Sequence, residues 1–278
     1  MNVTNFLAAE FKTGVPLGIL MIILCILGVI FLNALIALIL FVLSVIKHKI
    51  SLGDSFKFAW GEFKKWYRSF YKYYLVVLLL LIFQVIFVVY GKKLALNVNL
   101  FWRTLIILSP SILMGIYYLI LNLSLAKSYY KVLQEGSEFK FTWISAAQFG
   151  RILVLTLVFW IFLIFGLIFL GIPSLLLSYL LPLIKYPIIV KDMKLGECIK
   201  DIFYLFKENF WDIILFVSIS NFILTVFQIQ IQLSLIGSLI EKIFLLMVVN
   251  PFVTMFLTVF YFKISGESSP KTETKVEK

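Results

Sequence analysis

Side chains that could do chemistry are few in this chain and lie far apart. His48 is the single histidine, and it stands between two lysines with no second histidine or cysteine near it. A zinc site needs several His, Cys or carboxylate ligands, and a cysteine nucleophile needs a histidine partner. No phosphate-binding loop, dinucleotide fingerprint or nucleophile elbow occurs, and the acids are spread through the loops. We therefore predict that the protein is not an enzyme and that it holds no metal or cofactor.

Lys185 is the candidate intramembrane polar site. It stands between Pro182 and Pro187, near the end of an apolar stretch. Ionisable groups within membrane spans mark ion or proton pathways, so this ammonium could face an anionic substrate. A lysine near the end of a span can instead extend its ammonium group to the membrane surface. The first interpretation predicts a transporter or permease component that works around Lys185.

A short motif recurs three times and supplies a second candidate site. The pattern G-x-x-F-K-F-x-W occurs at 53–60 and 136–143, and a weaker copy occurs at 196–203. In the first copy, aromatic residues step by three and four, which predicts one apolar stripe on a helix, with cations on another face. An interfacial helix needs both faces, because its rings sink to the headgroup boundary while its cations meet anionic lipid. The candidate anionic-lipid contacts are Lys57, Lys64, Lys65, Arg68 and Lys72.

Composition identifies the solvent in which these elements fold. Hydrophobic residues make up 62% of the 278 residues and charged residues 14%. This excludes an ordinary soluble domain, which is about 45–50% apolar, and it excludes disorder. Six runs without a charged residue have the length of a membrane span. The net charge of +11 is expected to mark loops that lie against anionic lipid, and no nucleic-acid partner is predicted.

The expected fold is an all-α integral membrane protein with about seven transmembrane helices and three cytoplasmic amphipathic helices. One transmembrane domain covers 1–264, and a polar tail over 265–278 is expected to be disordered. The expected spans are 16–46, 73–91, 104–126, 152–170, 174–190, 211–232 and 243–262. The expected interfacial helices are 54–72, 137–150 and 194–209. The first apolar run is read as one long tilted helix, although a hairpin, giving eight spans, stays open; the range is six to eight.

Basic residues predict the orientation of the domain. With the motif copies and the C-terminus on one side, 20 Lys and Arg residues lie on that side and five lie on the other. Cytoplasmic loops carry an excess of Lys and Arg, so the copies and the C-terminus are expected in the cytoplasm. The predicted location is the cell membrane, crossed several times.

Short segments of the second half resemble a known family. They read Leu-Gly-Ile-Pro at 170–173, Lys-Tyr-Pro-Ile-Ile-Val at 185–190, Leu-Gly-Glu-Cys-Ile-Lys at 195–200, Phe-Lys-Glu-Asn-Phe-Trp at 206–211, Asn-Pro-Phe at 250–252 and Phe-Tyr-Phe-Lys at 260–263. This part, about 120–264, is similar to the glycerophosphoryl diester phosphodiesterase membrane-domain family and related prokaryotic membrane proteins. In that family the membrane domain is sometimes fused to a phosphodiesterase domain, whose metal-binding acids do not occur here. The resemblance implies the fold of the membrane part only.

The function expected from these patterns is a non-catalytic membrane scaffold or lipid-interacting protein. Its expected partner is the lipid bilayer, with anionic headgroups at the basic face. A protein partner or a second copy of the chain is also possible on this interpretation. The transporter built around Lys185 is the alternative.

Overall fold

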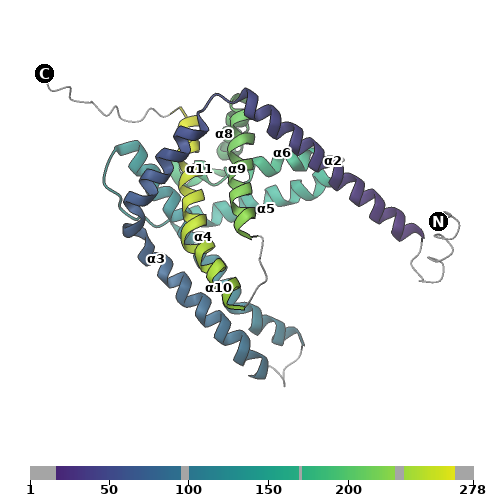
Figure 1. Ribbon diagram of the computed structural model, residues 1–278, viewed down its shortest axis with the longest axis vertical. Helices are drawn as coiled ribbons and strands as arrows, with labels where there is room; N and C mark the ends of the chain where they lie inside the picture. Colours follow the sequence, from purple (N-terminus) through teal and green to yellow (C-terminus); the bar gives the residue numbers. More distant parts are fainter. Residues whose placement is uncertain (1–16, 95–99, 169–170, 229–234, 267–278) are drawn as a thin grey trace.

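The computed structural model describes residues 17–94, 100–168, 171–228 and 235–266, and this part of the chain is all helical, with no strand (Figure 1). Most of the expected tail therefore lies outside the described residues. The helices are α2 (Leu17–Lys47), α3 (Leu52–Leu94), α4 (Leu100–Glu135), α5 (Ala146–Ile168), α6 (Ile172–Leu180), α7 (Tyr186–Lys191), α8 (Leu195–Glu208), α9 (Phe210–Gln228), α10 (Leu235–Phe244), a π-helical turn (Leu245–Val249) and α11 (Asn250–Ile264).

Several helices are long and apolar enough to cross a membrane. Within the described residues five stretches qualify, and a sixth is obtained if α8 and α9 are counted together as one bent span. The five are Ile26–Lys47, Leu52–Gln84, Leu108–Glu135, Ala146–Gly166 and Ile240–Ile264. The expected class, a helical membrane protein, agrees with this arrangement, whereas the count of seven stays a prediction.

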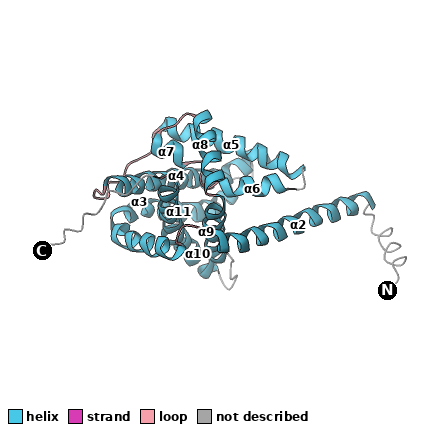
Figure 2. Cartoon of the chain, turned by 90° about the horizontal axis from the view of Figure 1, so that it is seen from above, coloured by secondary structure: helices cyan, strands magenta, loops and turns pink. Residues whose placement is uncertain are grey.

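The first apolar run forms one helix over its described residues. α2 has 31 residues, which at 1.5 Å per residue makes it about 46 Å long. No break occurs near Gly28 or Asn33, so the hairpin alternative is wrong. Figure 2 shows α2 reaching away from the other helices, and its apolar side chains are exposed, as for Phe31 (72%). A helix that is apolar all round and exposed is suited to contact with lipid.

The first motif copy and the second expected span are not separate elements, because α3 contains both. Residues 54–72 and 73–91 were expected as an interfacial helix and a separate span, but both belong to one helix of 43 residues, about 64 Å long. No glycine or proline occurs over 62–90, so nothing in the sequence there interrupts the backbone hydrogen bonds. α4, with 36 residues, likewise extends well beyond the expected 104–126.

The expected fifth span, 174–190, is not a continuous helix. The chain turns at Gly171, which has a φ of 75°, and α6 then ends at Leu180. Residues 181–185 form a turn, and α7 follows. Pro182 and Pro187 flank the break; each lacks an amide donor and disfavours helix in the residue before it. A Cβ atom at position 171 would lie 2.2 Å from the Asn33 side chain, so α2 packs here on bare backbone.

α11 stands at the centre of the bundle. Every residue over 251–262 is buried, and the helix packs against α3, α4 and α9 (Figure 1). The π-helical turn directly before it accommodates Pro251, which has no amide proton for a normal helical bond. The buried core includes the adjoining parts of α3, α4 and α9, at the end of the bundle that carries the α2–α3 loop.

Candidate lipid-contact face and polar junctions

The five predicted lipid contacts lie together on α3. Their side chains are all exposed, and at 100° per residue they fall within an arc of about 100°. Opposite this arc lie the buried residues Ala59, Phe63 and Phe70. We call the set Lys57, Lys64, Lys65, Arg68 and Lys72 the basic face.

Most of the charge on the basic face is not neutralised. Lys65 lies 3.9 Å from the carboxylate of Glu62, and this is the only ion pair of the face among the described residues. Three of the ammonium groups lie over aromatic rings: Lys64 over Trp60 at 5.1 Å, Lys65 over Trp66 at 4.5 Å and Lys72 over Tyr73 at 5.3 Å. Such contacts orient the side chain and leave its charge available to an anion.

The aromatic stripe of α3 does not have the expected role. Its rings were expected to enter the lipid headgroup layer, but the central ones are buried against the bundle. Phe63 lies 5.8 Å from Phe252 of α11 and packs edge to face with it, and Phe56 does the same at 5.1 Å. α11 therefore competes successfully with lipid for the central rings, whereas Phe56 (39% exposed) and Trp60 (38%) at the start of the stripe stay at the surface together with the cations.

The second motif copy is not helical, so the expected helix over 137–150 is wrong for residues 137–145 and holds only from Ala146 onward. Residues 136–145 have no helical structure, and α5 begins at Ala146. The aromatic residues of this segment alternate and lie along α3: Phe139 near Trp66 at 5.9 Å and Phe141 on Tyr73 at 4.1 Å. The Ser128 hydroxyl of α4 accepts a hydrogen bond from the backbone amide of Thr142 (2.7 Å). The segment thus joins α3 to α4.

The third copy forms α8 close to the expected bounds of 194–209. It meets α9 at an angle of 100°, with the bend at Asn209. Glu197 caps its start by accepting a hydrogen bond from the Lys194 amide (3.2 Å). The side buried against the bundle consists of Cys198, Ile202 and Leu205. The helical spacing of this copy predicts an apolar stripe of Leu195, Ile199, Ile202, Phe203, Phe206 and Phe210, of which only Ile202 is fully buried and Phe203 is exposed. Leu195, Ile199 and Phe206 were expected to form part of this stripe. These last residues are only partly buried.

Cys198 yields a prediction for the environment of α8. Burial and, to a smaller extent, the nearby Asp201 carboxylate together raise the pKa of its thiol to about 12. Because the thiolate is the reactive form, alkylation by iodoacetamide should be slow at pH 8 and should still increase with pH above pH 10. Site-resolved peptide mass spectrometry measures this rate, with denatured protein as the control. A plateau near pH 9 would contradict the buried placement.

Lys185 lies in the turn between α6 and α7. Its ammonium group is 5.4 Å from the ring centre of Tyr186, the side chain is partly buried, and it has no ion pair within the described part of the chain. The expected location near the end of a continuous span is therefore wrong, because the helix is broken at this point.

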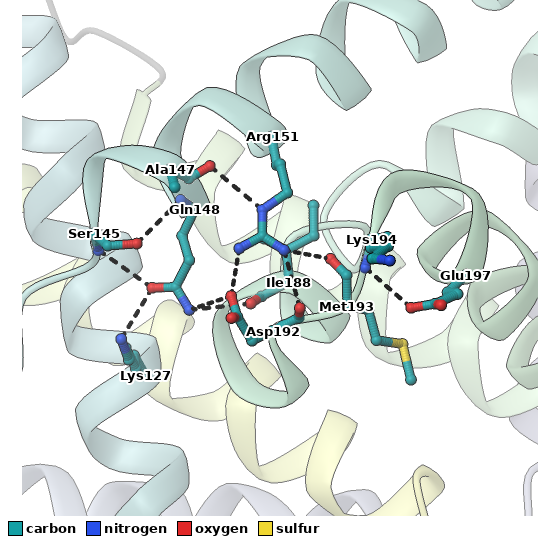
Figure 3. Close-up of polar contacts among 10 residues, drawn as sticks. All are labelled: Lys127, Ser145, Ala147, Gln148, Arg151, Ile188, Asp192, Met193, Lys194 and Glu197. Atoms are coloured by element: carbon teal, nitrogen blue, oxygen red, sulfur yellow. Dashed lines mark hydrogen bonds and ion pairs between the residues drawn. The ribbon is translucent and has the colours of Figure 1, made fainter.

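A polar junction that the sequence analysis missed ties α4, α5 and α7 together (Figure 3). Arg151 donates to the carboxylate of Asp192 and, at 2.9 Å each, to the backbone carbonyls of Asp192 and Met193. Gln148 donates to the Ile188 carbonyl (3.3 Å) and accepts from the Lys127 ammonium (2.9 Å). The start of α5 and the end of α7 are thereby held together, so α5, α6 and α7 form a hairpin.

One part of this junction has a sequence signal. The Gln148 amide donates to the Ser145 hydroxyl, and the Ser145 amide donates to the Gln148 side chain, both at 3.2 Å. This is the reciprocal S-x-x-Q capping box, which starts α5 at the residue after Ser145. The pattern predicts a helix start at 146 rather than a helix already formed over 137–145.

A second junction fixes the loop between α2 and α3. Asp212, at the start of α9, is buried, and one of its carboxylate oxygens accepts hydrogen bonds from the backbone amides of Lys49 and Ile50, both at 2.9 Å. The ammonium group of Lys47 lies 4.8 Å from the Trp211 ring centre. Lys263 of α11 donates to Ser55 at 2.7 Å. α9 and α11 therefore both hydrogen-bond to the chain just before the basic face, α9 at the α2–α3 loop and α11 at the first turn of α3.

The described residues show no cluster of metal-ligating side chains. None of their His, Cys, Asp and Glu side chains come together in a group of three that could hold a metal ion. The one histidine ring bonds through Nδ1 to the Val45 carbonyl (2.8 Å). Comparison with known protein families, curated proteins and solved structures found no match. The resemblance to the phosphodiesterase membrane-domain family stays a prediction.

Proposed function

We propose that the protein is a non-catalytic membrane protein that binds anionic lipid headgroups through the basic face of α3. The observation that carries the proposal is the segregation of charge on α3: five exposed cations opposite a buried aromatic side, with one ion pair among them. A cation near an anionic membrane surface contributes about 1 kcal/mol, so five together favour anionic over neutral lipid. As an alternative partner, another protein with an acidic surface would fit the same face.

The proposed topology places the basic face at the cytoplasmic surface of the cell membrane. The excess of Lys and Arg supports this side. α2, α3, α4, α5, α9 and the α10–α11 helix each cross the bilayer, and α6 with α7 returns the chain as a broken span. α8 then lies along the membrane surface, as its 100° angle to α9 supports.

Charge reversal tests the proposed function. The triple variant Lys57→Glu, Lys64→Glu, Arg68→Glu should lower the enrichment of phosphatidylglycerol over phosphatidylcholine around the protein at least about tenfold, given about 1 kcal/mol per cation. Native mass spectrometry of protein extracted from mixed-lipid nanodiscs measures the lipid that is retained.

The matched control reverses three exposed lysines elsewhere, Lys131, Lys140 and Lys194, and changes the net charge equally. Equal loss of phosphatidylglycerol in both variants would refute a site on α3 and would leave only a general effect of net charge. Retention of a second protein at fixed stoichiometry, lost on reversal of the basic face, would make that protein the partner in place of lipid.

A second candidate function, an anion transporter around Lys185, is favoured by one observation. The helix is broken at the turn that carries this unpaired cation, and discontinuous helices form the binding sites of many transporters. Proteoliposomes loaded with labelled inorganic phosphate or chloride test it. Lys185→Ala should abolish flux that the protein supports and Lys185→Arg should preserve it. Flux no greater than in protein-free liposomes would eliminate this candidate.

A further inference from the structure

A groove of about 540 Å³ lies between α5, α6 and α8. All ten side chains that line it are apolar; they include Phe162 of α5, Leu176 of α6 and Phe203 of α8. The volume is within the range of small-ligand sites, about 300–1,000 Å³. The groove is open to one side, because Phe162 is 58% exposed and Phe203 is 47% exposed. A ligand that fills it must be apolar.

The charged residues of α8 share one polar side of the helix, and within it the two lysines lie nearest the groove. Lys200 and Lys207 stand three residues before and four residues after Phe203, so both lie within about 60° of this groove residue. The acids Glu197 and Glu208 lie more than about 120° away from it. The edge of the groove on α8 is therefore cationic, while its floor carries no polar group.

The location of the groove indicates the phase from which its ligand comes. α8 makes a 100° angle with α9, and α5 is long and apolar enough to cross the bilayer. An amphipathic helix in this orientation lies at the interface, so the side that faces α5 and α6 is directed to the acyl region. A ligand there has an apolar chain toward the helices and an anionic group toward Lys200 and Lys207.

We propose that this groove binds one acyl chain of an anionic phospholipid, with the phosphate beside Lys200 and Lys207. The site extends the proposed lipid binding from headgroup contact on α3 to a chain-binding site on other helices. This second proposal shares with the proposed function the premise that the protein lies in a bilayer. It does not depend on the basic face of α3. Either site can therefore fail alone.

Photolabelling tests the chain-binding site. The full-length protein is placed in phosphatidylcholine nanodiscs doped with phosphatidylglycerol that carries a diazirine on its acyl chain. Peptide mass spectrometry should find labels at Phe162, Leu176 or Phe203 roughly tenfold more often than at exposed α2 residues such as Phe31, as expected for about 1.4 kcal/mol of preference. Even labelling of α2 and the groove would overturn the proposal.

Three variants distinguish a bound lipid from lipid that merely surrounds the protein. Leu176→Trp fills the groove and should abolish the enriched labelling, whereas Leu157→Trp, on an exposed part of α5 outside the groove, should preserve it. Lys200→Glu with Lys207→Glu changes only the exposed edge, so it tests the charge even if the tryptophan variant fails to fold. It should lower labelling by the anionic probe about tenfold.

The controls separate the two proposed sites. Lys131→Glu with Lys140→Glu should leave groove labelling unchanged, and so should charge reversal of the basic face. An equal signal from a diazirine-labelled phosphatidylcholine would overturn the anionic character of the ligand. Loss of groove labelling on reversal of the basic face would overturn the independence of the two sites.

Discussion

Replacing Asp212 with alanine is expected to lower the free energy of unfolding by about 2–4 kcal/mol. The buried carboxylate accepts hydrogen bonds from two backbone amides of the α2–α3 loop. A hydrogen bond to a charged group contributes about 1.5–3 kcal/mol, and a buried amide left without an acceptor costs about 1–3 kcal/mol. These costs overlap because they describe the same bonds, and water that enters the loop offsets part of them.

Denaturant titration in mixed micelles, followed by tryptophan fluorescence, measures the effect, since Trp211 stands next to the changed residue. Asp212→Asn keeps one side-chain oxygen as acceptor but loses the charge, so its loss should be roughly half as large. Glu208→Ala removes an exposed carboxylate from the nearby end of α8 and should change stability by less than about 0.5 kcal/mol. If Asp212→Ala is as stable as this control, the carboxylate does not hold the loop.

Truncating Tyr186 to alanine should cost about 3 kcal/mol or more. The ring is fully buried and stacks on Tyr261 of α11, with ring centres 4.8 Å apart. Removing a buried aromatic ring loses its packing and leaves a cavity, which typically costs about 3–5 kcal/mol. α7 is only six residues long, and this ring joins it to the central helix.

Tyr186→Phe separates packing from hydrogen bonding. The hydroxyl lies 3.3 Å from the Thr258 hydroxyl and 3.4 Å from the Thr254 carbonyl, and its loss should cost only about 1 kcal/mol. Tyr204→Ala, at a position that is 65% exposed, controls for removal of a tyrosine in general. The same denaturant titration compares the three variants. Equal losses for Tyr186→Phe and Tyr186→Ala would show that ring packing contributes little.

The sequence predicted well those elements that a local pattern of apolar or charged residues determines without contacts from distant parts of the chain. Apolar length was enough to identify the helical membrane class, and the third motif copy marked the position of α8 to within one residue at each end. In α3 the three- and four-residue spacing correctly placed the cations on one face. It did not reveal that α11 supplies Phe252 as a partner for the aromatic face, because that contact joins residues far apart in the sequence.

The second motif copy shows how similar letters misled the prediction. The segment Phe139-Lys-Phe-Thr-Trp143 shares its letters with the first copy, but its rings alternate with polar residues, a period of two that is typical of extended backbone. It follows Gly136, whose φ of 63° ends α4. The first copy has further aromatic residues at helical spacing after Trp60, whereas the second has none of these.

The break in the expected fifth span could have been predicted from the sequence, whereas the junction at Arg151 could not. Counting charge-free residues does not register prolines, although Pro182 and Pro187 indicate a break. The pairing of Arg151 with Asp192 joins residues 41 positions apart, and no local pattern in one sequence predicts it. The proposed chain-binding groove depends on such contacts, since they hold the segment between α7 and α8 against α5.

The central position of α11 has a consequence for biogenesis. α3, α4 and α9 pack against α11 but precede it in the chain, so they are synthesised first. Each of them therefore enters the membrane before α11, its later packing partner, is present. The phenylalanine, tyrosine and serine side chains of α3, α4 and α9 must meanwhile face lipid, one another or an insertion factor. Packing of the bundle can be completed only after α11 has been inserted. Nascent chains released before this point should therefore be recognised by membrane quality control, however well their individual helices have formed.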